Sequence, residues 1–138
     1  MRVFFDTNVV LDVLCRREPF YAASAEAFAL AELRKIDGLL SAVSFTTIYY
    51  LACKLVGRDQ ARTFIAKLRD VFDVAACDSA VVNRAIDSGM PDFEDAVQHF
   101  SAVQAGAECI LTRNQPDFAD ADIPVVTPAE FLAMHSFE

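Results

Sequence analysis

The chain has 138 residues, 54% of them hydrophobic, and a net charge of −8. This length and composition suit a single domain with a substantial core, spanning residues 1–138. The acidic charge excludes a protein that holds nucleic acid by general electrostatic attraction, because that mode relies on clustered Lys and Arg. The sequence shows no basic leader and no apolar run of about 18 residues, which predicts a cytoplasmic protein without a membrane segment. The cysteines lie far apart without a zinc-binding spacing, so we expect buried free thiols.

Short apolar runs alternate with segments of helical periodicity. In chain order, the pattern predicts a strand over 2–5, helices over 9–16 and 21–35, a strand over 39–43, a helix from the N-cap Ser44 to Gly57, a helix over 58–72, a strand over 74–77, a helix between Asp78 and Gly89, a helix over 92–105, strands over 109–112 and 123–126, and a last helix capped by Thr127. Strands that alternate with helices form right-handed crossovers. We therefore expect an α/β fold whose parallel sheet is covered on both faces.

Three acidic residues occupy positions that such a sheet would bring together. Asp6 follows the first strand, Asp117 follows the fourth strand, and Asp95 lies near the start of the helix over 92–105. Ligands of open parallel sheets bind outside the carboxyl ends of the strands, where the strand order reverses, and the first and fourth strands commonly flank that point. The three carboxylates are thus candidates for one divalent-metal site. The alternative is that Asp6 caps a helix and that Asp92 and Asp95 only complement a helix dipole.

Four short motifs, in this order, resemble the PIN domain family. They are FDTN (Phe5 to Asn8), SFTT (Ser44 to Thr47), DFEDA (Asp92 to Ala96) and LTRNQPDF (Leu111 to Phe118). The chain looks in particular like the small VapC-like ribonuclease toxins of toxin–antitoxin pairs. The resemblance implies a three-layer α/β/α sandwich with a central parallel sheet of about five strands. It also implies metal-dependent endoribonuclease activity with Mg²⁺ or Mn²⁺, an RNA substrate, a cognate antitoxin and a homodimer.

The resemblance assigns catalysis and metal binding to Asp6, Asp95 and Asp117. Supporting roles fall to Asn8, Ser44, Thr47, Asp92, Thr112 and Asn114, although helix capping is the preferred interpretation of Ser44 and Thr47. Two positions depart from the family pattern. Thr46-Thr47-Ile48 stands where many members carry a glutamate, and Asn114 stands where many carry an aspartate. We expect a second metal ion to bind weakly for this reason. His99, one turn beyond Asp95, is interpreted as a polar surface or packing residue.

The stretch from Lys54 to Arg69 is the most basic part of this acidic chain. Lys54, Arg58, Arg62 and, after the fourth strand, Arg113 are therefore candidates for contacting RNA. A solvated helix surface explains the first three residues equally well.

Three other functions fit parts of the pattern. A catalytically impaired PIN domain that binds RNA or protein is favoured by the missing glutamate. A receiver-like signalling domain would need a phosphoacceptor near the end of the third strand, for which Asp78 is available, and a lysine after the fifth strand, yet no lysine follows Lys67. A phosphatase of the haloacid-dehalogenase type would need an aspartate where Asn8 stands.

Overall fold

The computed structural model describes residues 1–118 and 120–137. Its elements are β1 (Arg2–Phe5), α1 (Thr7–Leu14), α2 (Tyr21–Glu32), β2 (Asp37–Ser41), α3 (Ala42–Val56), α4 (Arg58–Val71), β3 (Asp73–Ala75), α5 (Ser79–Asp87), α6 (Phe93–Gln104), β4 (Cys109–Leu111), the 3-10 helix η1 (Gln115–Phe118), β5 (Val125–Val126) and α7 (Pro128–Met134). Strands and helices alternate in the predicted order, with two helices in succession at three places.

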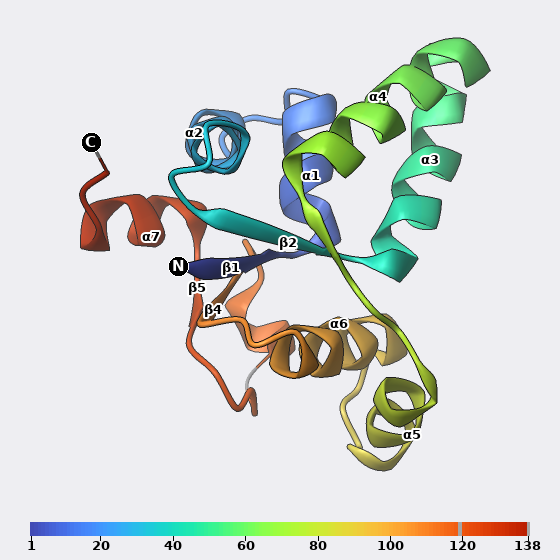
Figure 1. Cartoon of the computed structure of the whole chain (residues 1–138), viewed down its shortest axis with the longest axis vertical. Coiled ribbons are helices and arrows are strands. Elements are labelled where there is room, and N and C mark those ends of the chain that lie inside the picture. The colour runs from blue at the N-terminus through green and yellow to red at the C-terminus, as the bar shows by residue number, and fades with distance from the viewer. Residues whose placement is uncertain (119, 138) are drawn as a thin grey trace.

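The strands form one sheet in the order β3-β2-β1-β4-β5, and every neighbouring pair is parallel. The chain leaves β1 toward β2 and later returns to β4 on the other side of β1 (Figure 1). The strand order therefore reverses between β1 and β4, where Phe5 pairs with Leu111. The predicted parallel sheet is confirmed, and so is the position of the fourth strand beside the first.

Alternate side chains of the strands pack against different helices. Val3 and Phe5 of β1 belong to a core shared with α1, α2, α3, α4 and α7, whereas Phe4 packs on the opposite face with residues of α6 and η1. A third cluster joins α5 to α6 through Val81 and Val97. Helices thus cover both faces of the sheet (Figure 1), as the resemblance implied.

Two element boundaries differ from the prediction. β2 ends at Ser41, and the Ser41 hydroxyl accepts a hydrogen bond from the Val43 amide, so Ser41 and not Ser44 caps α3. α1 begins at Thr7 rather than at residue 9, directly after β1. Both differences have the same cause: at each of these two places the helix begins within two residues of the end of the strand. Asp78 and Thr127 cap α5 and α7 as predicted.

The cysteine prediction holds only in part. Cys15, Cys53, Cys77 and Cys109 are free thiols, but only Cys109 is buried. In the described part of the chain, no helix combines the length and apolar character needed to cross a membrane.

Candidate active site

A pocket of about 270 Å³ lies at the carboxyl end of the sheet, where the strand order reverses. We call it the acidic pocket, because its lining includes the carboxylates Asp6, Asp92, Glu94, Asp95 and Asp117, with Thr7, Asn8, Leu11, Thr47, Leu51 and Gln98 completing it. Among the described lining residues there is no Lys or Arg. The structure therefore brings together all three predicted catalytic residues.

Asp6 is the most deeply placed of these carboxylates, with 3% of its surface exposed. One carboxylate oxygen accepts a hydrogen bond of 3.0 Å from Gln98 Nε2 of α6, and the other accepts one of 2.8 Å from Thr112 Oγ1, which follows β4. Burial raises the pKa of Asp6, although these two hydrogen bonds oppose the shift. Asp6 also occupies the N-cap position of α1, where the nearby Asn8 amide likewise opposes the rise of its pKa.

Thr7 connects the end of β1 to two helices. Its amide donates to Gln98 Oε1 at 3.1 Å, and its hydroxyl shares a hydrogen bond of 2.6 Å with Ser44 Oγ of α3. Ser44 is buried within α3, so its predicted role as the helix cap is wrong, and it does not itself line the acidic pocket. It instead holds α3 against the start of α1.

Asp92, Glu94 and Asp95 enter the acidic pocket from the start of α6. Asp92 caps this helix by accepting a hydrogen bond of 2.9 Å from the Asp95 amide, a role that the sequence pattern did not assign to it. Burial, followed by the nearby charges of Asp92, Asp6 and Asp117, raises the pKa of Asp95 to about 7. Burial also raises the pKa of Glu94, with the charge of Asp92 adding to the effect. Burial is the larger cause of both shifts, and the neighbouring carboxylates add to it.

The donor set of the acidic pocket suits a hard divalent cation, because carboxylate oxygens are the ligands that Mg²⁺ prefers. Within residues 1–118 and 120–137, no group of three or more His, Cys, Asp or Glu side chains is arranged to hold a metal ion directly. Mg²⁺ commonly uses one or two protein carboxylates and keeps several waters, so this arrangement remains compatible with it. A cation would also relieve the charge repulsion that raises the pKa of Asp95.

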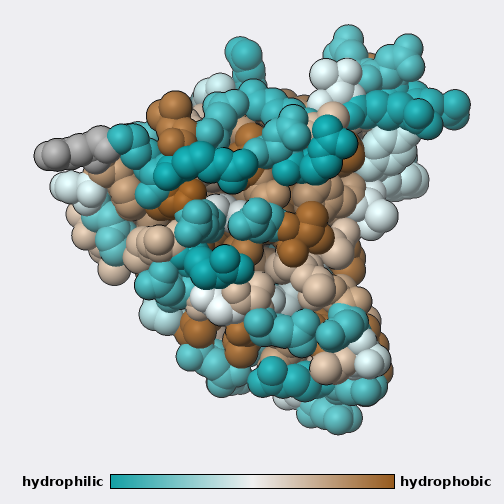
Figure 2. Space-filling view, in the orientation of Figure 1, coloured by the Kyte–Doolittle hydropathy of each residue, from teal (hydrophilic) through white to brown (hydrophobic). Residues whose placement is uncertain are grey.

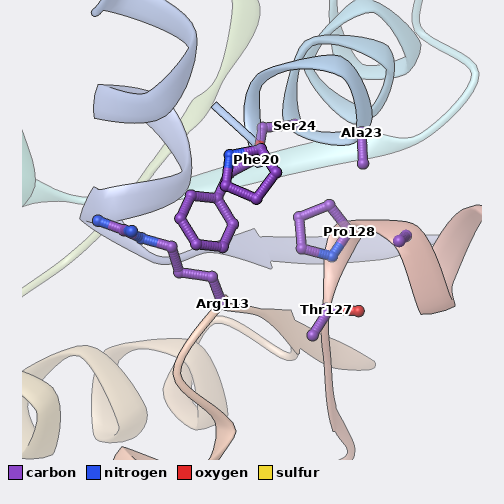
Figure 3. A pocket seen from close by; sticks show the side chains of 8 residues that line it. Phe20, Ala23, Ser24, Arg113, Thr127 and Pro128 are labelled. Carbon is purple, nitrogen blue, oxygen red and sulfur yellow. The ribbon is translucent and has the colours of Figure 1, made fainter. Parts of the chain in front are cut away.

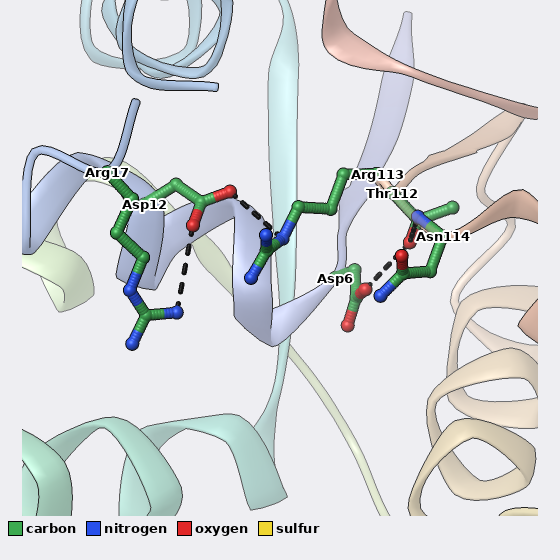
Figure 4. Close-up of polar contacts among 6 residues, drawn as sticks. All are labelled: Asp6, Asp12, Arg17, Thr112, Arg113 and Asn114. Atoms are coloured by element: carbon green, nitrogen blue, oxygen red, sulfur yellow. Dashed lines mark hydrogen bonds and ion pairs between the residues drawn. The ribbon is translucent and has the colours of Figure 1, made fainter. Parts of the chain in front are cut away.

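A second buried carboxylate, Asp12, lies on α1 close to the acidic pocket and has 0% of its surface exposed. Arg113 Nε lies 3.3 Å from one of its oxygens, and Arg17 Nη1 lies 3.7 Å from the other (Figure 4). The Arg113 guanidinium also stacks 4.4 Å from the centre of the Phe20 ring. The Arg113 side chain, 24% exposed, is therefore held against α1 by this ion pair and ring contact. It ties the segment after β4 to α1.

The aliphatic part of Arg113 also borders a separate pocket of about 230 Å³. There the Phe20 ring lies between Arg113 and Pro128, while the guanidinium points away toward α1 (Figure 3). The other lining residues are mostly small or apolar. This pocket offers packing for Arg113 but no group suited to catalysis.

Three further candidate residues lie outside the acidic pocket. Asn114 is exposed, and its amide donates to Thr112 Oγ1 at 3.1 Å, so it supports Thr112 through its backbone. His99 is buried and accepts a hydrogen bond of 3.0 Å from the Asp122 amide, which confirms the packing interpretation. The Lys54 ammonium lies 4.4 Å from the centre of the exposed Tyr50 ring.

Sequence reasoning missed three residues. Gln98 hydrogen-bonds Asp6, Glu94 adds a carboxylate to the acidic pocket, and Asp12 anchors Arg113. The sequence signal for Glu94 was its place beside Asp95 within DFEDA. For Gln98 the signal was weaker, and consisted only of its position one helical turn after Asp95. The pairing of Asp12 with Arg113 spans distant segments and left no local pattern.

The end of β3 also argues against a receiver-like domain. β3 is the edge strand of the sheet, and Asp78 beyond it caps α5 by accepting a hydrogen bond of 3.1 Å from the Val81 amide. A side chain in this role lies outside the crevice between β1 and β4. The receiver interpretation is therefore not supported.

Comparisons with known proteins agree with this geometry. A PIN domain family model matches residues 2–116. The chain is 30% identical to "Ribonuclease VapC1" of Aquifex aeolicus (strain VF5), in an alignment that covers 94% of this chain and 92% of that protein. A structure of VapBC-1 from nontypeable Haemophilus influenzae superposes with a TM-score of 0.70 at 15% identity, covering 94% of this chain and 99% of that one. A toxin–antitoxin complex from Klebsiella pneumoniae gives a TM-score of 0.69 at 22% identity, covering 91% of this chain and 97% of that one. The protein described here belongs to the PIN domain family.

Proposed function

We propose that this protein is a divalent-cation-dependent endoribonuclease that acts as the toxin of a toxin–antitoxin pair. The observation that carries the proposal is the acidic pocket, in which carboxylates from three distant parts of the chain meet without a Lys or Arg among the described lining residues. The similarity to a protein named a ribonuclease, over nearly the whole chain, supports the same function.

Asp6, Asp95 and Asp117 are the residues that would hold Mg²⁺ or Mn²⁺, with Glu94 as a further oxygen donor. When bound, such an ion supplies a nucleophilic water and stabilises charge on the phosphoryl oxygens. Glu94 adds a carboxylate that the sequence analysis did not count, and thereby offsets the absence of an acid at Thr47. This addition favours an active enzyme over a catalytically impaired PIN domain.

Gln98 and Thr112 position Asp6. Each donates one hydrogen bond to a different carboxylate oxygen, so each oxygen retains a further lone pair for a cation. Neither donor is charged, so the carboxylate keeps its negative charge uncompensated. Asp95, with its pKa raised to about 7, can take up or release a proton near neutral pH.

The partners follow from the same comparison. Solved structures of similar fold include VapBC-1 and a toxin–antitoxin complex. We infer that an antitoxin covers the acidic pocket of this protein and contributes a basic side chain to it, since the pocket's charges favour a cation.

The test is incubation of the purified protein with a mixture of single-stranded RNAs in Mn²⁺ or in EDTA. We expect internal cleavage with Mn²⁺ and none with EDTA. Binding of the RNAs without cleavage in either condition would support the catalytically impaired alternative and overturn the proposal.

A further inference from the structure

A second, more open groove of about 530 Å³ lies between α3, α4 and the edge strand β3. Phe45 and Tyr49 of α3 form one wall, Arg62 and Arg69 of α4 form the other, and Val74 of β3 lies between them. No Asp or Glu is among the described residues that line it. We call it the arginine groove, and it contrasts with a chain whose net charge is −8.

The arginines of this groove lie along one line of α4. Arg62 and Arg69 are seven residues apart, which places them within about 20° of one another around a helix of about 3.6 residues per turn. Arg69 Nε lies 3.4 Å from Asp70 Oδ1, with both side chains more than 70% exposed, and pairs this exposed are weak. The projecting ends of α3 and α4 present mainly hydrophilic atoms to solvent (Figure 2). The arginines are therefore available to an anionic partner.

Two aromatic rings stand opposite these arginines. Phe45 and Tyr49 are one turn apart on α3, and both are only partly buried. A row of guanidinium groups beside aromatic faces matches single-stranded nucleic acid, since the phosphates take the charges and the bases stack on the rings. An acidic protein segment would use the arginines but has no planar rings to place on Phe45 and Tyr49.

Helix α3 is the wall shared by both sites. Thr47 and Leu51 line the acidic pocket, while Phe45 and Tyr49 line the arginine groove. Because these pairs are two positions apart, the two sites lie on different faces of α3, and a single strand of RNA that passes around this helix could contact both.

We propose that the arginine groove binds the single-stranded RNA that flanks the cleavage site, with bases on Tyr49 and Phe45 and phosphates on Arg62 and Arg69. This inference rests on the proposed ribonuclease function. Of the basic residues first assigned to RNA, it uses Arg62, and it adds Arg69, Tyr49 and Phe45.

The test compares two pairs of variants. Tyr49→Leu is matched by Tyr50→Leu, because Tyr50 is the neighbouring residue but does not line the groove. Arg62→Ala is matched by Arg84→Ala, which removes the same charge from α5. Binding of a fluorescent 12-nucleotide single-stranded RNA is measured in EDTA at several salt concentrations, and KM and kcat are measured with Mn²⁺.

We expect Tyr49→Leu to weaken RNA binding about tenfold, the size expected for one lost base stack. We expect Arg62→Ala to weaken binding and to lower the slope of log K against log salt by about 0.7, the value for one phosphate contact on a single strand. Both variants should raise KM with little change in kcat, and both control variants should match the wild type. Thermal unfolding of each variant checks the fold, and Arg69→Ala provides an independent exposed substitution.

If Tyr49→Leu and Tyr50→Leu bind RNA equally well and the wild type cleaves RNA, the proposal that the arginine groove binds RNA is wrong, and the ribonuclease function stands. A wild type that binds RNA through the groove but cleaves nothing would overturn the ribonuclease function alone. A poly-glutamate peptide serves as the competing probe. If Arg62→Ala and Tyr49→Leu lose this peptide but keep RNA, the groove binds protein and the proposal is wrong.

Discussion

Asp6 and Asp12 are two buried carboxylates on neighbouring segments, and their surroundings differ in one respect. Asp6 receives hydrogen bonds from the neutral groups of Gln98 and Thr112, whereas Asp12 faces the guanidinium groups of Arg113 and Arg17. Burial raises the pKa of both residues. Only Asp12 has cations of the protein's own beside it to oppose that shift.

The difference separates a structural charge from a functional one. A buried ion pair is disrupted at high cost when one partner is removed, since the remaining charge stays buried. A buried carboxylate without a cationic partner is instead destabilising for the metal-free protein and is available to a ligand. Asp12 therefore holds two segments together, and Asp6 is placed to bind a cation.

The largest effect should come from neutralising Asp6. We expect Asp6→Asn to abolish Mn²⁺-dependent RNA cleavage, because it removes the charge at the centre of the acidic pocket. The unfolding free energy should change by no more than about 1 kcal/mol, the scale of one net hydrogen bond. Cleavage assays and urea denaturation measure the two quantities. Turnover at the wild-type rate would contradict the assignment of Asp6.

The second prediction concerns the other carboxylate. Arg113→Met should lower the unfolding free energy by about 3 kcal/mol, because Asp12 then keeps only the more distant Arg17 as a partner. Urea denaturation measures this, with the exposed Arg84→Met as the matched control. The double variant Asp12→Leu with Arg113→Met should recover part of the loss. A loss below about 1 kcal/mol in Arg113→Met would show that the Asp12–Arg113 pair is as weakly coupled as a surface ion pair, although Asp12 is buried.

The contrast between these carboxylates also explains how far the sequence could predict the site. Asp6 and Asp117 follow strands, so their meeting was implied by a parallel sheet with the fourth strand beside the first. The role of Asp12 depends on Arg113, about a hundred residues away, and no periodicity reports such a pair. For the same reason the sequence could not show that Arg113 pairs with Asp12, because its residue type and its place after a strand are the same whether an arginine faces solvent or a buried carboxylate.

The fold was more predictable than the contacts. Alternation of apolar runs and helical segments was enough for the order of elements and for the parallel sheet. Ser41 and Ser44 were both acceptable helix caps by residue type, and only the position at which β2 ends decides between them. Nothing in the sequence around Gln98 indicates that its side-chain amide points to Asp6 rather than to solvent.

The third prediction addresses how Asp6 is held. Thr112→Val removes the hydroxyl that donates to Asp6 at 2.8 Å while keeping the side-chain shape. We expect RNA cleavage to fall about 10- to 100-fold, the range seen when groups that orient metal ligands are removed. Thr63→Val is the control, because the exposed Thr63 hydroxyl donates only to the Asp59 carbonyl of its own helix. Equal activity in the two variants would show that Thr112 does not position Asp6.

The fourth prediction is a pH dependence of stability caused by Asp95. Its pKa rises from 3.8 to about 7 in the folded protein, so between these values the folded state keeps a proton that the unfolded chain has lost. The raised pKa therefore stabilises the fold fully below about pH 4, and this contribution is lost as the pH rises toward about 7. Asp95→Asn removes the titration, so the two proteins should unfold at similar temperatures near pH 4, and the variant should be the more stable one at pH 7.

Thermal unfolding in EDTA from pH 4 to pH 8 measures this difference, with Asp59→Asn as an exposed control on α4. Repeating the series with Mn²⁺ sharpens the comparison with Asp12. A cation that binds Asp95 displaces its proton, so Mn²⁺ should stabilise the wild type more at pH 8 than at pH 5. An unfolding temperature that depends on pH in the same way in the wild type and in Asp95→Asn would show that the pKa of Asp95 is not raised in the folded protein. The acidic pocket would then lack the electrostatic property that distinguishes it from the arginine-paired site of Asp12.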